Sequence, residues 1–259
     1  MTDIKDLPIA VIDSGVGGIS VLRELIKIMP CENYLYLGDS KNAPYGKRTR
    51  EDVLDITRRN LDYLKKLGIK ALVIACNTAT AAAANALREE NPDLVIVGIE
   101  PAIKPAATSL PSPRIIVMAT PLTLSQDKYL SLAHRFSDTS EIIPLPCPGL
   151  VELIEGGKLD SPEIDEYLNS LLSPYKDENI DAVVLGCTHY PHVRAAIARQ
   201  LSQKTLILDG GEGTARQTRR RLGELSLLRD SSERGLVEIK NSTGDPRLIE
   251  LSQYLLYRE

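Results

Sequence analysis

One feature constrains this chain more than any other: an apolar run that ends in a small residue and then a cysteine occurs twice. Residues 69–80 read IKALVIACNTAT and residues 180–191 read IDAVVLGCTHYP, so that Cys76 and Cys187 each follow a run of strand length. Some flanking residues also recur at the spacing that separates Cys76 from Cys187, as Ile69 and Ile180 do. We interpret the pattern as two similar halves, each with a thiol at the end of a buried strand.

Short apolar runs alternate with helical patterns along the whole chain, and runs such as ALVIA and AVVLG are apolar on both faces. A parallel strand covered by helices on both sides has this composition. The expected strands are 9–12, 34–37, 71–75, 94–98, 115–119, 142–146, 182–186 and 205–208. The expected helices are 18–28, 51–67, 80–89, 125–133, 162–174, 192–200 and 214–224. The alternation predicts an α/β protein.

The internal echo predicts two similar doubly wound parallel-sheet domains, related by pseudo-symmetry, with an active site in the cleft between them. Prolines interrupt the helix and strand patterns at positions 101, 105, 111 and 113, where we place the boundary. A glycine-rich turn at 210–213 marks the return crossing. We therefore expect a first domain of residues 1–100 and 212–259, and a second domain of residues 101–211.

Composition excludes several classes of function. The formal net charge of −4 gives no reason to expect nucleic-acid or membrane binding, and we interpret the basic run at 216–222 as a solvated helix face. The apolar runs are too short to span a bilayer. The N-terminal sequence lacks the layout of a signal peptide, which favours a cytoplasmic protein with reduced thiols. The cysteines do not form the spacing of a zinc site, so no metal site is predicted.

Open parallel sheets bind ligands outside the carboxyl ends of their strands, so the polar residues that follow each expected strand are the candidate site. These residues are Asp13, Ser14, Asp39, Ser40, Pro44, Tyr45, Gly46, Cys76, Asn77, Thr78, Thr120, Thr123, Glu152, Glu155, Cys187, Thr188 and His189. Two opposed thiols suit a proton-transfer reaction that treats both hands of a carbon centre alike. A buried cysteine is also a common small apolar residue, and we interpret Cys31 and Cys147 in that way.

Two of the motifs have a plain structural alternative. The turn DSGVGG at 13–18 could hold an anion on backbone N–H groups, or Asp13 or Ser14 could simply cap the helix that follows. The segment NAPYG at 42–46 has the composition of a loop, in which Tyr45 could present its hydroxyl and Gly46 its N–H group.

Taken together, the segments resemble the cofactor-independent aspartate/glutamate racemase family, and glutamate racemases in particular. The resemblance runs from about residue 9 to residue 222 and rests on IDSGVGGISVLREL, YLGDSKNAPYG, ACNTATA, GIEPAIKPA, the segment 120–123, CPGLVELIEGG and LGCTHYP. LGCTHYP separates the chain from aspartate racemases, which typically carry Glu where this chain has His189.

The resemblance implies that Cys76 and Cys187 are the two acid/base residues, with Cys76 deprotonating the D form and Cys187 the L form. Asp13 would assist Cys76, while His189 would assist Cys187 and be oriented by Glu155, or by Glu152, which stands where many relatives have proline. The implied substrate contacts are Asp13, Ser14, Pro44, Tyr45, Gly46, Asn77, Thr78, Thr120, Thr123, Thr188 and His189.

The resemblance further implies glutamate as the substrate, no cofactor, a homodimer, and D-glutamate supplied for peptidoglycan synthesis. Three alternatives stay open at this point. The chain could act on aspartate or a hydantoin, it could be a redox or regulatory protein in which Cys76 and Cys187 form a reversible disulfide, or it could also bind a protein partner.

Overall fold

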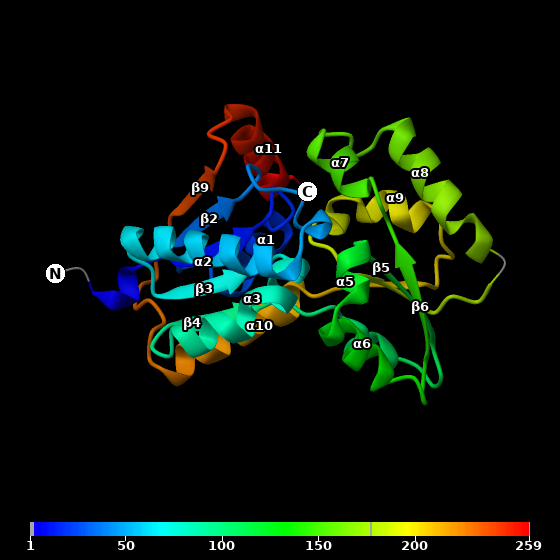
Figure 1. Cartoon of the computed structure of the whole chain (residues 1–259), viewed down its shortest axis with the longest axis horizontal. Coiled ribbons are helices and arrows are strands. Elements are labelled where there is room, and N and C mark those ends of the chain that lie inside the picture. Colours follow the sequence, from blue (N-terminus) through cyan, green and yellow to red (C-terminus); the bar gives the residue numbers. More distant parts are fainter. Residues whose placement is uncertain (1–2, 177, 259) are drawn as a thin grey trace. The chain divides into compact units, whose positions relative to one another are not determined.

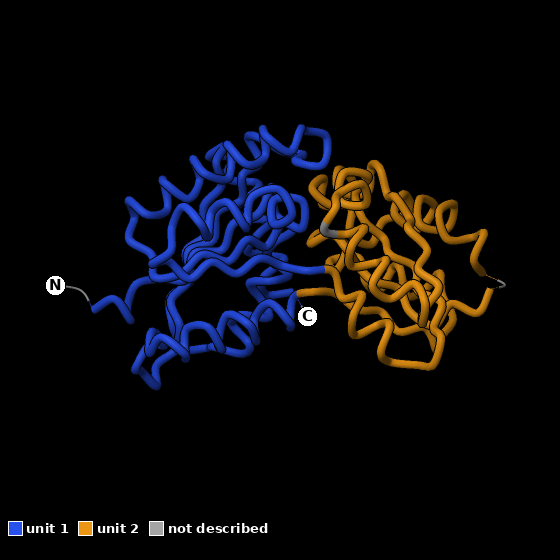
Figure 2. The backbone as a smooth tube through the Cα atoms, turned by 60° about the horizontal axis from the view of Figure 1, so that its bottom comes forward, with its two compact units in different colours: residues 1–100, 211–259 blue, residues 101–210 orange. Residues whose placement is uncertain are grey.

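The protein is described here by a computed structural model that covers residues 3–176 and 178–258. The chain divides into two compact units, residues 1–100 with 211–259 and residues 101–210, which Figure 2 draws in different colours. Each unit is built on one parallel sheet with helices between successive strands (Figure 1). The predicted fold class, two doubly wound parallel α/β domains, is confirmed.

The first unit contains a five-stranded sheet in the order β4-β3-β1-β2-β9, in which all neighbours are parallel. Its strands are β1 (Ile9–Asp13), β2 (Tyr34–Gly38), β3 (Ala71–Ile74), β4 (Val95–Gly98) and β9 (Val237–Asn241). Its helices are α1 (Ile19–Ile28), α2 (Arg50–Leu67), α3 (Asn77–Glu90), α10 (Gly211–Glu224) and α11 (Pro246–Tyr257). Helix α2 packs along α3 (Figure 1), and α1 packs along α10.

The second unit contains a four-stranded parallel sheet in the order β6-β5-β7-β8. Its strands are β5 (Arg114–Ala119), β6 (Glu141–Pro146), β7 (Ala182–Leu185) and β8 (Leu206–Asp209). Its helices are α4 (Ile103–Ala107), α5 (Pro121–Ser125), α6 (Asp127–His134), α7 (Leu150–Glu155), α8 (Pro162–Leu172) and α9 (Arg194–Arg199).

The two sheets share one strand order. The order β4-β3-β1-β2 in the first unit corresponds to β8-β7-β5-β6 in the second, and β9 is an additional edge strand beside β2. The two cysteine segments occupy equivalent places, because β3 ends two residues before Cys76 and β7 ends two residues before Cys187. The repeat seen in the sequence therefore corresponds to a repeated strand topology.

Burial explains why these runs form strands. All residues of β1 are buried, and alternate side chains point to opposite faces of the sheet. Ala10 and Ile12 pack with the apolar stripes of α2 and α3 in one core, while Ile9 and Val11 are buried on the other face. Helix α2 begins at the N-cap Thr49, whose hydroxyl accepts the N–H of Asp52, and it ends before Gly68, which has a φ of 81°.

Several elements differ from the sequence-based expectation. Helix α3 begins at Asn77 rather than at residue 80, because Cys76 itself is the N-cap. The short helices α4, α5 and α7 were not predicted, nor were β9 and α11 near the C-terminus. Strand β9 offers only Val237 and Ile239 as apolar residues, so its sequence lacks the signal of a buried strand, and its pairing with β2 determines its conformation. Among the described residues, no helix has the length and hydrophobicity needed to cross a membrane.

Candidate active site

The thiol of the first unit lies at the N-terminal end of α3. Cys76 is 6% exposed, and its Sγ accepts the N–H of Ala79 at 3.5 Å, as an N-cap side chain does. The same sulfur lies 3.9 Å from Ser14 Oγ. The N-terminal end of a helix favours negative charge, so this position suits a thiolate.

The turn after β1 lies beside this thiol because β1 and β3 are neighbours in the sheet. Asp13 is buried, and its Oδ1 accepts the N–H of Gly15 at 3.0 Å. Neither Asp13 nor Ser14 caps α1, whose N-cap is Gly18 without any side-chain cap. The capping alternative is therefore wrong. A Cβ at Gly18 would lie 2.6 Å from Asp13 Cβ, so only glycine permits this approach of α1 to the aspartate.

Asn77 and Thr78 form the first turn of α3 and are both buried. The side-chain oxygen of Asn77 has no hydrogen-bond partner within residues 3–176 and 178–258. An unsatisfied buried acceptor costs about 1–3 kcal/mol, which a bound donor would recover. The structure thus provides a vacant acceptor beside the Cys76 thiol.

The segment 42–46 follows β2 and contains a 3₁₀ turn at Tyr45–Lys47 with Pro44 as its N-cap. Tyr45 is 1% exposed, and its hydroxyl donates to Asp39 Oδ2 at 2.6 Å. Burial, and then the neighbouring charge of Asp39, raise the pKa of Tyr45 well above its ordinary value. The hydroxyl is therefore engaged inside the protein, and the backbone of Tyr45 and Gly46 is what this segment can offer a ligand.

The thiol of the second unit has a different environment. Cys187 Sγ lies 3.7 Å from Nδ1 of His189, and Nε2 of His189 lies 3.0 Å from Glu155 Oε1. His189 is 2% exposed. Burial lowers the pKa of His189, but the hydrogen bonds to Cys187 and Glu155 outweigh it, and the pKa is raised well above the ordinary value. The imidazolium form is favoured between a thiol and a carboxylate.

The carboxylate that contacts His189 belongs to Glu155, at the end of α7, whose side chain is 21% exposed. Glu152 lies one turn earlier on the same helix and is exposed. Helix α7 begins after Gly149, which has a φ of 91°, a conformation that favours glycine. This turn sets the position from which Glu155 reaches the histidine.

The remaining candidates of the second unit have structural partners as well. Thr120 is the N-cap of α5, and its Oγ1 lies 2.9 Å from that of Thr123 and accepts the N–H of Thr123. Thr188 is buried next to Cys187. Sequence reasoning gave no role to Tyr190, which is fully buried and donates its hydroxyl to the carbonyl of Cys147 at 3.5 Å. Its place in LGCTHYP was the available signal.

The other two cysteines differ from this pair. Cys147 is buried, its S–H donates to the Leu145 carbonyl at 3.3 Å, and burial raises its pKa to about 12. Cys31 is partly exposed in the segment that follows α1. All four cysteines are free thiols. In the part of the chain that the structure describes, no three His, Cys, Asp or Glu side chains gather as metal ligands would.

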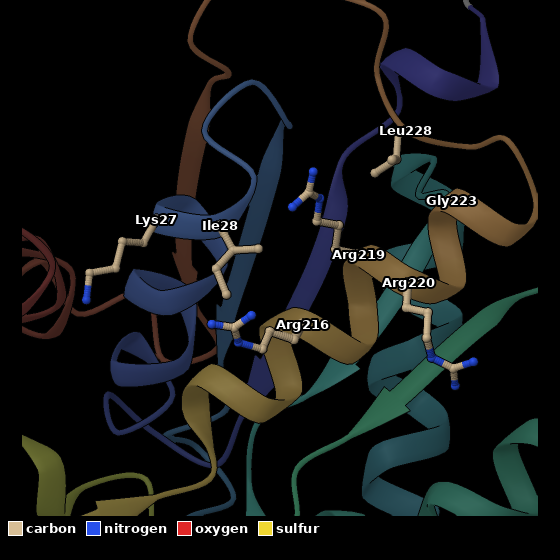
Figure 3. Close-up of a pocket in the computed structure, with 7 residues that line it drawn as sticks. All are labelled: Lys27, Ile28, Arg216, Arg219, Arg220, Gly223 and Leu228. Atoms are coloured by element: carbon tan, nitrogen blue, oxygen red, sulfur yellow. The ribbon is translucent and has the colours of Figure 1, made fainter.

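A surface hollow lies elsewhere in the first unit. It encloses about 650 Å³ and is lined by Lys27 and Ile28 of α1, the α10 arginines 216, 219 and 220, Gly223 and Leu228 (Figure 3). Arg216 pairs with Glu212, and Arg220 pairs with Glu224, along the same helix. Both arginine side chains are more than half exposed, so the basic run forms a solvated helix face. None of the predicted site residues lines this hollow.

Comparison with known proteins identifies the family of the chain. The sequence pattern of the Asp/Glu/hydantoin racemase family matches residues 9–218. Glutamate racemase of Clostridium perfringens is 47% identical over 98% of both chains, and that of Clostridium kluyveri is 51% identical over 98% of this chain and 99% of its own. The crystal structure of glutamate racemase from Francisella tularensis in complex with D-glutamate superposes with a TM-score of 0.84 at 26% identity, covering 98% of this chain and 95% of that one. The chain therefore belongs to the Asp/Glu/hydantoin racemase family and is an isomerase of the glutamate racemase type.

Proposed function

We propose that this protein interconverts L- and D-glutamate by a two-base proton transfer between Cys76 and Cys187, without a cofactor. The observation that carries the proposal is that the two units have one topology and hold a free thiol after equivalent strands, β3 and β7. Each thiol has a neighbour that stabilises its anion, the start of α3 for Cys76 and His189 for Cys187. Two such bases suit a carbon whose proton must leave one face and return to the other.

The chemical difficulty is the weak acidity of the α-proton of an amino acid. No electron sink such as pyridoxal phosphate enters the proposed mechanism, so fixed dipoles and hydrogen-bond donors must stabilise the charge that develops. A thiol has an ordinary pKa of about 8.5, nearer to neutrality than that of lysine or tyrosine. In our proposal the thiolate of Cys76 removes the proton of D-glutamate, while the thiol of Cys187 delivers a proton to the opposite face. The roles exchange for L-glutamate.

On the Cys76 side, the vacant oxygen of Asn77 would accept a hydrogen bond from the substrate ammonium. Asp13 would assist the thiol from the turn after β1, where Ser14 already lies 3.9 Å from the sulfur. The backbone N–H groups of the segment 44–46, with Thr78, would hold a substrate carboxylate. These roles use groups that the fold has already fixed in position.

On the Cys187 side, we propose that the His189 imidazolium stabilises the thiolate and supplies or takes its proton. Glu155 would hold the imidazole by the 3.0 Å contact to Nε2, which fixes which nitrogen faces the sulfur. Thr188, Thr120 and Thr123 would contact the substrate. The Francisella tularensis relative was crystallised with D-glutamate, which supports the choice of substrate.

The proposed cellular role is to supply D-glutamate for peptidoglycan synthesis in the cytoplasm, with the protein acting as a homodimer. This proposal is supported by the sequence comparison, because about half of the residues of this chain are identical to those of full-length glutamate racemases. Light scattering of the purified protein tests the oligomeric state, and a monomer at working concentration would refute the homodimer.

The decisive experiment incubates dialysed protein with L- or D-glutamate in D₂O, following optical rotation and α-deuterium. Wild type should racemise both enantiomers with deuterium uptake. Cys76→Ala should lose racemisation but still exchange the α-proton of L-glutamate, and Cys187→Ala should exchange only that of D-glutamate. Cys31→Ala is the matched control and should retain activity. Racemisation by Cys76→Ala at the wild-type rate would refute the two-thiol mechanism, and aspartate in place of glutamate tests the substrate.

A further inference from the structure

A buried carboxylate behind the segment 42–46 has no role in the proposed chemistry. Asp39 directly follows β2, is 0% exposed, and donates its N–H to the Asp13 carbonyl at 2.8 Å. Removing a carboxylate from water costs free energy unless hydrogen bonds compensate the lost hydration, so the partners of Asp39 indicate its function. All of its side-chain hydrogen-bond partners among the described residues are neutral.

Three side chains converge on this carboxylate. The Tyr45 hydroxyl donates to Oδ2 at 2.6 Å, and the Asn42 amide donates to both oxygens at 3.0 Å. Asn60 belongs to a different element, α2, and its Nδ2 lies 2.9 Å from Asp39 Oδ2 and 3.2 Å from the Tyr45 hydroxyl oxygen. Two of the three donors lie in the segment 42–46 itself. The cluster therefore joins both ends of that segment to β2 and α2.

The two residues that precede Asn42 are held by the C-terminal part of the first unit. Asn241 donates to the Ser40 hydroxyl at 2.9 Å, and the N–H of Lys41 donates to the Ser242 hydroxyl at 3.0 Å. These contacts fix residues 40 and 41 but do not reach Tyr45. The ring of Tyr45 packs in the core of the first unit, and its hydroxyl is held by Asp39 and Asn60, so both the core and this cluster position the 3₁₀ turn Tyr45–Lys47.

We propose that Asn60 and Asp39 are positioning residues that act through the Tyr45 hydroxyl to hold the backbone of Tyr45 and Gly46 ready for the substrate carboxylate. This inference rests on the proposed function, because that function gives the segment its ligand. Hydrogen bonds to a charged acceptor are stronger than those between neutral groups. A segment held before binding loses less freedom when substrate binds, so the cluster lowers KM.

Asn60 is the residue to test because we expect the fold to tolerate its truncation. Its side chain is partly buried and lines a surface hollow of about 530 Å³ with Tyr63 and Asn241. Truncation there opens into this hollow and leaves no closed cavity. Asn60→Ala removes the donor, and Asn60→Asp replaces it with a second carboxyl beside Asp39. Two adjacent carboxylates cannot both ionise easily, so one keeps its proton to higher pH and can still donate.

Steady-state kinetics with glutamate at pH 6 and pH 9 give the first readout, each variant being compared with wild type at the same pH. Asn60→Ala should raise KM at both pH values by about fivefold or more, with kcat little changed, as expected for lost binding in ground and transition states alike. Asn60→Asp should have a KM for glutamate close to that of wild type at pH 6 and a higher KM than wild type at pH 9. Asn85→Asp, at an exposed position on α3, is the matched control and should change neither.

Trypsin gives a second readout that needs no substrate. Lys47 is exposed at the end of the 3₁₀ turn, so its cleavage rate follows the fraction of molecules in which the segment is open. Asn60→Ala should speed this cleavage, while Leu64→Ala, which weakens the core of α2 without touching the cluster, should leave it unchanged relative to other sites. If wild type did not racemise glutamate but Asn60→Ala were still cleaved faster than wild type, only the proposed function would be refuted. If Asn60→Ala were cleaved at Lys47 as slowly as wild type, or if an active Asn60→Ala had the same KM as wild type, the positioning role would be refuted.

Discussion

Replacing Glu155 by glutamine tests the electrostatics of the second thiol site. The contact between Glu155 Oε1 and His189 Nε2 is 3.0 Å, with a histidine that is almost fully buried and a carboxylate whose side chain is 21% exposed. A hydrogen bond to a charged group contributes about 1.5–3 kcal/mol to folding, and partial exposure of the carboxylate reduces this to about 1–2 kcal/mol. We expect Glu155→Gln to lose stability of this size at pH 6.

The pH dependence of that loss has a definite sign. The pKa of His189 is raised in the folded protein, so the folded state binds this proton more tightly than the unfolded chain does. The stabilisation is complete below the unfolded pKa of about 6.5 and disappears as the pH rises through the folded pKa. The difference in unfolding free energy between wild type and Glu155→Gln should therefore be largest at pH 6 and shrink at alkaline pH.

Urea unfolding of both proteins across this pH range measures the difference directly. Glu152→Gln is the matched control, because it makes the same substitution one turn earlier on α7 at an exposed position. It should change the unfolding free energy by no more than about 0.5 kcal/mol at any pH. A loss for Glu155→Gln that is independent of pH, or an equal loss for Glu152→Gln, would show that no charged His189–Glu155 pair stabilises the fold.

Three further predictions concern the groups around the sites. Cys147, with a pKa of about 12, should escape iodoacetamide at pH 8 in the folded protein, which peptide mass spectrometry would show; labelling at the denatured rate would contradict this. Lys70→Met leaves the buried carboxylate of Glu32 without a charged partner and with the N–H of Arg229 as its remaining donor, so it should cost about 3–5 kcal/mol in urea unfolding. A loss below about 1 kcal/mol would mean that water reaches Glu32. Gly18→Ala places a Cβ 2.6 Å from Asp13 Cβ and should cost about 1–3 kcal/mol, so an unchanged thermal midpoint would refute the packing constraint at this turn.

The sequence predicted the central strands of both sheets because these strands are buried on both faces. Runs such as those at 71–74 and 182–185 have few alternatives to a central parallel strand, and the structure contains both. Strand β9 escaped prediction because its conformation depends on pairing with β2, about 200 residues earlier in the sequence. Local composition carries no information about such pairing. Helix α11 was also not predicted, although Asp245 as N-cap and Pro246 at the first helical position are local signals of a helix start.

The candidate site shows the same limit at the level of single side chains. The CTH motif indicated a thiol and an imidazole near one another, and the structure places Cys187 Sγ and His189 Nδ1 3.7 Å apart. The direction of the Tyr45 hydroxyl could not be predicted, because Asp39 and Asn60 reach it from separate elements. Sequence identifies residues that chemistry needs, whereas the neighbours that orient them are set by the tertiary fold.

The two thiols illustrate how one topology can support two chemical environments. Cys76 follows β3 and caps α3, so its sulfur lies at the positive end of the helix dipole and near the Ser14 hydroxyl. Cys187 follows the equivalent strand β7, but no long helix begins directly after it, and a histidine held by Glu155 takes the place of the helix terminus. A helix terminus keeps its polarity at every pH, while an imidazolium loses its charge as the pH rises. The electrostatic environment of Cys187 therefore changes with pH as His189 loses its proton, whereas the helix terminus at Cys76 does not change.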